Sequence, residues 1–159
     1  MSLNARAVFT GDIAIDTDAV YTCGMNTCMF LCISTKKYVI GWHFSWENTQ
    51  GLNMLRVRHL LDTVKDVQNV CLIPGADRQI DLSLNPECRT MREHPNVDPQ
   101  FSAEYFIDFI SQYEWADNVR VCWPINHYKE FVRFDRKDGR PCIARNDEAF
   151  DKMCYYDAG

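Results

Sequence analysis

Short apolar runs separated by polar turns are the main pattern along the chain, and they predict buried β-strands. The first two runs are joined by the polar turn 34–37 and predict a hairpin. A second hairpin is expected around Lys137-Asp138-Gly139, because an Asp-Gly pair suits a tight turn. The expected strands are 28–33, 38–44, 69–73, 118–123, 131–136 and 141–145.

Two helices are expected among these strands. From Leu52 to Val67 the apolar residues recur close to every 3.6 positions, which is the period of a helix with one buried face. From Phe101 to Tyr113 aromatic side chains share one face, after a proline that suits a first turn. Helices between strands predict an α/β or α+β fold, a mixed β-sheet or β-sandwich with helices packed on one side. We expect a single domain, residues 1–159, with a long irregular loop from Gly75 to Asn96.

The charge balance narrows the classes of partner. The chain has 17 Lys and Arg residues against 22 Asp and Glu residues, a net charge of −5, which argues against a nucleic-acid partner. No apolar run reaches the roughly 20 residues that a membrane-spanning helix needs. No signal-peptide pattern follows Met1. We therefore expect a cytoplasmic protein that is not associated with a membrane, with export as an effector left open.

The eight cysteines are expected to be reduced, because no two are spaced Cys-x-x-Cys and several lie inside apolar runs. A reduced cysteine in such a run behaves as a small hydrophobic residue. Neither a structural zinc site nor any other cofactor is expected. His94 and Cys88 are interpreted as loop residues rather than metal ligands.

Cys28 and His43 are the candidate reactive pair. Cys28 stands where a loop turns into the first predicted strand, and His43 lies near the end of the return strand. A nucleophilic cysteine needs an imidazole that takes its proton and later returns it to the leaving group. Thr22 is the candidate for orienting the imidazole, and backbone N–H groups around Asn26 to Cys28 are candidates for stabilising an oxyanion. Spacing alone favours the simpler interpretation, a buried structural thiol and a hydrogen-bonded sheet histidine.

Two neighbouring cysteines are weaker candidates for the nucleophile. Cys23 ranks second, and a disulfide between Cys23 and Cys28 is a further alternative. Cys32, four residues after Cys28, is expected in the core.

A resemblance to a known family changes this weighing. The segment Thr22-x-Gly24-x-x-x-Cys28-x-x-x-Cys32, followed by Gly41-x-His43, resembles the chemotaxis-receptor glutamine deamidases, the CheD family. The resemblance implies that Thr22, Cys28 and His43 form a catalytic group. The catalytic domains of cytotoxic necrotizing factor-like toxins are more remotely similar. Where the family has Gly-Ser before its cysteine, this chain has Asn26-Thr27, which alters a loop expected to approach the substrate.

The implied activity is that of a cysteine-dependent protein-glutamine deamidase, which works through a thioester and releases ammonia. The expected partner is a protein that presents a glutamine, with its identity and the oligomeric state of this chain left open. Asn26 and Thr27 are assigned to the oxyanion loop. Trp42, Trp46 and Gly75 are candidates for substrate binding, although its place in the strand favours core packing for Trp42. Two other functions stay open: a non-catalytic protein-binding domain of the same fold, and a transglutaminase-like or other cysteine hydrolase.

Overall fold

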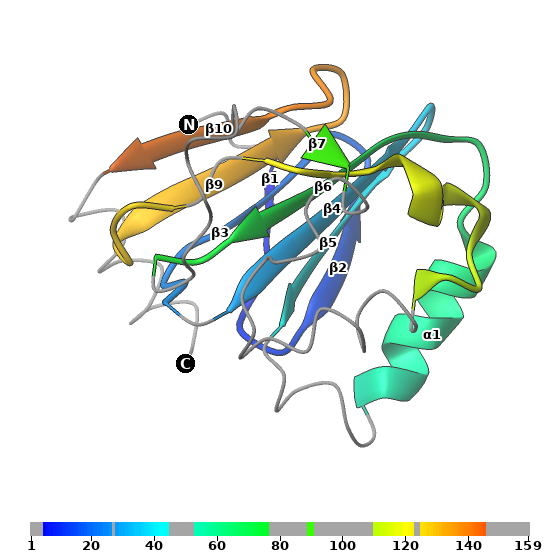
Figure 1. Ribbon diagram of the computed structural model, residues 1–159, viewed down its shortest axis with the longest axis horizontal. Helices are drawn as coiled ribbons and strands as arrows, with labels where there is room; N and C mark the ends of the chain where they lie inside the picture. Colours follow the sequence, from blue (N-terminus) through cyan, green and yellow to red (C-terminus); the bar gives the residue numbers. More distant parts are fainter. Residues whose placement is uncertain are drawn as a thin grey trace.

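The computed structural model describes residues 5–26, 28–44, 53–76, 89–90, 110–122 and 125–145. These residues form two β-sheets, the helix α1 (Asn53–Thr63) and the 3₁₀ helix η3 (Glu114–Asn118) (Figure 1). The strands are β1 (Ala5–Ala7), β2 (Ile13–Asp16), β3 (Ala19–Thr22), β4 (Met29–Thr35), β5 (Val39–Phe44), β6 (Val67–Pro74), β7 (Arg89–Thr90), β8 (Val119–Val121), β9 (Glu130–Asp135) and β10 (Pro141–Arg145). The fold is therefore α+β and mostly β, which confirms the predicted class.

The two sheets are both mixed. The smaller sheet has the strand order β1-β3-β9-β10, in which only β1 and β3 are parallel. The larger sheet has the order β2-β5-β4-β6-β8-β7, in which only β6 and β8 are parallel. Parallel neighbours need a long crossover connection, and between β6 and β8 the chain supplies more than forty residues for it.

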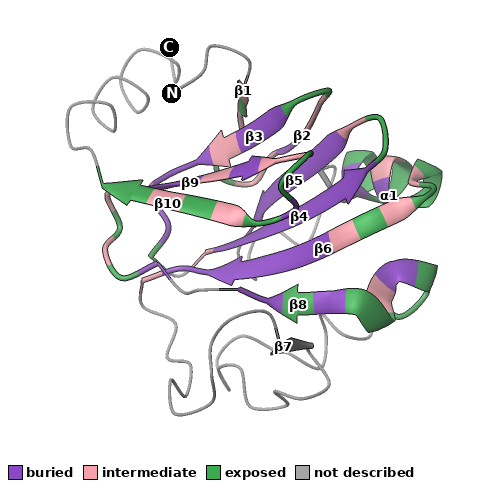
Figure 2. Ribbon diagram, turned by 90° about the horizontal axis from the view of Figure 1, so that it is seen from above, coloured by how far each residue is buried: buried purple, intermediate pink, exposed green. Residues whose placement is uncertain are grey.

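Side-chain alternation along β4 divides the interior into two cores. Phe30 and Cys32 point into a core between the two sheets, which we call the inter-sheet core. Leu31 and Ile33 point to the opposite face, into a core shared with α1, which we call the helix-side core. Every residue of β4 and β5 is buried, so these strands read as continuous apolar runs rather than alternating ones (Figure 2).

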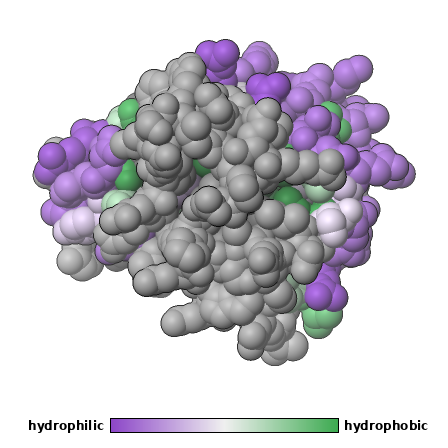
Figure 3. Space-filling view, viewed as in Figure 1, coloured by the Kyte–Doolittle hydropathy of each residue, from purple (hydrophilic) through white to green (hydrophobic). Residues whose placement is uncertain are grey.

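The helix α1 covers one face of the larger sheet through residues spaced as helical neighbours. Met54, Val57 and Leu61 are its buried side chains, and they belong to the helix-side core. The outer face is polar, apart from Leu55, which is exposed. The described side chains seen on the surface are mostly hydrophilic (Figure 3).

Both predicted hairpins are confirmed. β4 and β5 pair antiparallel, and the Thr35 hydroxyl accepts the backbone N–H groups of Lys37 and Tyr38 in the turn between them. β9 and β10 pair antiparallel around a turn in which Gly139 has φ 63°, a conformation that favours glycine. The predicted strands 69–73 and 118–123 correspond to β6 and β8, with shifted ends.

The predicted end of the first helix is wrong. The helix stops at Thr63, the chain turns at Asp66 with φ 57°, and Val67 already belongs to β6. Val67 continues the helical spacing in the sequence, but it pairs with Thr35 in the ladder between β4 and β6. The second predicted helix falls mostly on residues 101–109, which lie outside the described residues. Its predicted last residues, 111–113, form a turn before η3.

The three strands at the beginning of the chain were not predicted. They contain only three or four residues each, and the burial patterns of β2 and β3 do not alternate. They matter for function because β3 carries Thr22 and pairs with β9 in the smaller sheet. Most of the predicted loop from Gly75 to Asn96 lies outside the described residues, although β7 falls within it.

Many of the connections between strands lie at one end of the two stacked sheets. There β1, β3, β5, β6, β8 and β10 end, and β2, β4 and β9 begin. This end lies on the left of Figure 1. We call it the Cys28 end, because the loop between β3 and β4 belongs to it.

Candidate functional site

The loop from β3 to β4, which we call the cysteine loop, forms the centre of the Cys28 end. Gly24 begins the loop with φ 69°, which an L side chain rarely adopts, and this accounts for a glycine two residues after Thr22. The Met25 side chain is fully buried in the inter-sheet core and anchors the loop, whereas Asn26 is exposed. Thr27 lies outside the described residues. Cys28 immediately precedes β4 and is half-buried.

Thr22 and His43 meet across the gap between the two sheets. The hydroxyl oxygen of Thr22 lies 2.7 Å from Nδ1 of His43 and 2.7 Å from the backbone oxygen of Val8. A carbonyl oxygen only accepts, so the single hydroxyl hydrogen is donated to Val8. The Thr22 oxygen must therefore accept a hydrogen from Nδ1. This arrangement assigns the proton of the neutral ring to Nδ1 and leaves a lone pair on Nε2.

The His43 ring is buried and neutral. None of its surface is exposed, and no described residue bonds to Nε2. Burial lowers the pKa of His43 from 6.5 to about 4. A hydrogen bond with the Val8 backbone raises the pKa by a smaller amount. At neutral pH the imidazole is therefore an uncharged base whose only available nitrogen is Nε2.

Strand register places Cys28 on the same face of the sheet as His43. Phe30 lies directly opposite His43 in the ladder between β4 and β5, and Cys28 precedes Phe30 by two residues. The Cys28 side chain accordingly packs against the inter-sheet core, as Phe30 does. The two residues are diagonal neighbours, a relation that puts Cβ atoms about 7 Å apart, within reach of a thiol and an imidazole ring.

Trp42 is not part of this site: the structure shows the core packing that the sequence favours, and the candidate role in substrate binding is wrong. It points into the helix-side core, stacked on Phe44 with ring centroids 4.0 Å apart, and is 1% exposed. The reason is alternation along β5, which sends residues 42 and 44 to one face and His43 to the other. Trp46 lies outside the described residues.

Gly75 reaches the site, but through its backbone. It is buried, and its N–H donates to the Cys28 carbonyl at 2.9 Å. The neighbouring Ala76 N–H donates to the Met25 carbonyl, also at 2.9 Å. Gly75 therefore contacts the cysteine loop itself rather than an open surface where a substrate would bind.

The other cysteines divide by environment. Cys32 is fully buried in the inter-sheet core, as expected, and burial followed by the neighbouring Cys71 raises the pKa of its thiol. Cys23 is buried beside Phe131 in a separate small cluster. Cys142, on β10, is exposed. The predicted loop residues Cys88 and His94 lie outside the described residues.

Two contributors to the site carried no sequence signal. Val8 acts through its carbonyl oxygen, which any residue type would supply. The Tyr128 carbonyl accepts the Gly24 N–H at 3.0 Å, so the connection between β8 and β9 also supports the cysteine loop. Both are backbone contacts between segments distant in the sequence.

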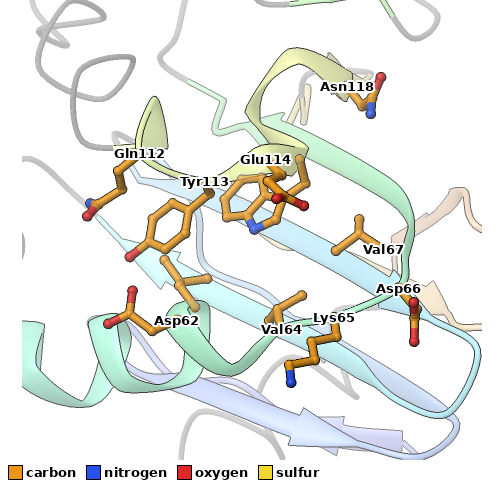
Figure 4. Close-up of a pocket in the computed structure, with 11 residues that line it drawn as sticks. Asp62, Val64, Lys65, Asp66, Val67, Gln112, Tyr113, Glu114 and Asn118 are labelled. Atoms are coloured by element: carbon orange, nitrogen blue, oxygen red, sulfur yellow. The ribbon is translucent and has the colours of Figure 1, made fainter.

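A separate cavity of about 750 Å³ lies at the other end of the sheets, on the helix side. It opens between the end of α1 and η3, where the Asp62 carboxylate faces the Tyr113 hydroxyl (Figure 4). Burial and, secondarily, Asp62 raise the pKa of Tyr113 to about 12. None of the residues that line this cavity belongs to the Cys28 end.

Within the described ranges, no three His, Cys, Asp or Glu side chains are grouped to hold a metal ion. No helix in the described part of the chain is long and apolar enough to cross a membrane. Comparison of the chain with protein-family models and with curated proteins finds no match to either.

Proposed function

We propose that this chain is a cysteine-dependent deamidase that converts a glutamine of a target protein to glutamate. The observation that carries the proposal is the 2.7 Å contact between Thr22 and Nδ1 of His43, because it leaves Nε2 as an unprotonated base. The register of β4 and β5, which puts Cys28 on the same face, supplies the nucleophile. The resemblance to the CheD family agrees with this group of three residues.

The proposed reaction uses the neutral imidazole in each step. Nε2 of His43 takes the proton of the Cys28 thiol as the sulfur adds to the side-chain amide carbon of the glutamine. The C–N bond then breaks, His43 returns the proton to the leaving nitrogen, and ammonia departs from a thioester. A water molecule, deprotonated by the same nitrogen, releases glutamate and restores the thiol.

The oxyanion formed in these steps needs hydrogen-bond donors, and the Asn26 N–H is the donor that we propose. The Met25 carbonyl is turned toward Ala76, which donates to it. In a trans peptide the N–H points opposite to the C=O, so the Asn26 N–H points away from Ala76. Such a donor contributes about 3 kcal/mol where it meets a developing negative charge.

One observation favours a different function, a protein-binding domain in which the same residues are structural. His43 has no exposed surface, as expected of a core histidine. In a binding domain the bond between Thr22 and His43 would hold the two sheets together and Cys28 would have no chemical task. The test below separates these two functions.

The test is release of ammonia from protein glutamines. The purified chain is incubated with a whole-cell protein extract, ammonia is measured, and peptides are analysed for glutamine converted to glutamate. We expect conversion by the native chain and by Cys142→Ser, the matched control on an exposed cysteine. We expect none by Cys28→Ser or His43→Asn. Conversion that survives Cys28→Ser, or no conversion at all, would contradict the proposal. Incorporation of an added primary amine instead would indicate a transglutaminase-like enzyme.

A further inference from the structure

The two residues that follow β6, Gly75 and Ala76, hold the cysteine loop through backbone hydrogen bonds, and we call this pair the strut. Beyond Pro74 the chain continues for two residues along the loop, and each of these residues donates its N–H to a loop carbonyl. Gly75 donates to Cys28 and Ala76 donates to Met25, both at 2.9 Å. The strut is itself supported, because the Ile125 N–H donates to the Pro74 carbonyl at 3.0 Å.

No side chain fits at position 75. A Cβ atom there would lie 2.5 Å from the Asn26 backbone oxygen and 2.6 Å from the Cys28 backbone oxygen. Both distances are far shorter than a carbon–oxygen contact allows, and both oxygens belong to the main chain, so neither can rotate away. Glycine is required here by the close approach of two backbones.

The strut fixes the position of the Cys28 backbone and therefore of its Cβ atom. The Cys28 carbonyl is held by Gly75 on one side, and β4, which follows directly, is held between β5 and β6. Moving the loop off Gly75 would rotate the Cys28 backbone and carry its Cβ away from the face that His43 shares. A displacement of about 1 Å at a reactive group is enough to lower its reactivity severely.

We propose that Gly75 is a positioning residue, whose lack of a side chain allows the Cys28 loop to sit where the thiol meets Nε2 of His43. This inference rests on the proposed function. It differs from the role expected from the sequence, because Gly75 would act through Cys28 rather than on the substrate. The same close approach makes Gly75 sensitive to the smallest possible substitution.

The test compares Gly75→Ala with Gly139→Ala. Gly139 is a matched control because it has φ 63° and its added Cβ would lie 2.4 Å from the Asn69 side chain, but it lies in the turn at the opposite end of the sheets. Both variants should lose stability in urea. Only Gly75→Ala should change the chemistry of Cys28.

The chemical readout is the pH profile of Cys28 alkylation by iodoacetamide, followed by peptide mass spectrometry. When a neutral imidazole takes the thiol proton as the sulfur reacts, the alkylation rate follows the population of the neutral thiol–imidazole pair, which stays constant between the two pKa values. An unassisted thiol, with a pKa of about 8.5, instead loses reactivity about tenfold for each pH unit below that value. The exposed Cys142 is alkylated in the same sample and serves as the internal reference for the rate.

We expect a plateau between about pH 5 and pH 8 in the native chain and in Gly139→Ala. In folded Gly75→Ala we expect the plateau to be lost and the rate at pH 6 to fall at least about tenfold. A folded Gly75→Ala that keeps the plateau would overturn the positioning role and leave the proposed function standing. A native chain without any plateau would instead overturn the proposed function.

A second variant covers the case in which Gly75→Ala does not fold. Ala76→Pro removes the N–H that bonds to the Met25 carbonyl and adds no atom at position 75. It should also lower the rate of Cys28 alkylation at pH 6 while leaving Cys142 unchanged. An intact plateau in folded Ala76→Pro would count against the strut.

Discussion

Replacing His43 by asparagine should remove an acid-sensitive part of the stability of this protein. Burial lowers the pKa of His43 from 6.5 to about 4, so the unfolded chain takes up a proton on this imidazole at higher pH than the folded chain does. The stabilisation is complete above pH 6.5 and is lost as the pH falls toward 4. The gap between these values corresponds to about 3 kcal/mol, a large part of the stability of a typical domain.

Asparagine is the informative substitution because its side-chain N–H group takes the place of Nδ1 and still donates to Thr22, but it does not titrate. Urea unfolding followed by circular dichroism at pH 7 and at pH 4.5 gives the free energies. Between these pH values the native chain should lose about 2 to 3 kcal/mol more than His43→Asn does. His127→Asn, at a partly exposed loop histidine, is the matched control and should behave as the native chain. Equal losses in the native chain and in His43→Asn would refute the argument that this ring is buried in its neutral form.

Two further substitutions test the supports of the site by urea unfolding at pH 7. Thr22→Val keeps the shape but removes the hydroxyl that bonds to both Nδ1 of His43 and the Val8 carbonyl, so it should cost about 2 kcal/mol. Thr22→Ser should cost clearly less, and equal costs would contradict the hydrogen-bond assignment. Gly24→Ala places a side chain at φ 69° and should cost about 1 kcal/mol. No loss in Gly24→Ala would mean that the loop relaxes to another conformation.

Long apolar runs made the centre of the fold predictable from the sequence. β4 and β5 are buried on both faces, so the sequence shows them as unbroken apolar segments with a polar turn between. The same property made the direction of their side chains unpredictable, because a run without alternation does not show which side chains point to which core. The register therefore had to come from the structure, and it separates Trp42 from His43.

The site was only partly visible in the sequence. Thr22, Cys28 and His43 stand out through their chemistry and the motif, but β3, which carries Thr22, is too short to show a pattern. Contacts made by backbone atoms leave no residue-type signal, as with the Val8 carbonyl. Gly75 did leave a signal, since it is a glycine directly after a strand. Its cause, the approach of the Cys28 loop, depends on pairing between segments about fifty residues apart in the sequence.

The proposed chemistry depends above all on the protonation state of the His43 ring, which nitrogen-15 NMR of the ring reports at each pH. Correlation of the ring hydrogens with both ring nitrogens at pH 7 distinguishes the two neutral forms from the imidazolium ion. We predict a proton on Nδ1 and a bare Nε2, with Thr22→Val disturbing the Nδ1 signal. A proton on Nε2, or a charged ring at pH 7, would contradict the account, because no base would then be left for Cys28.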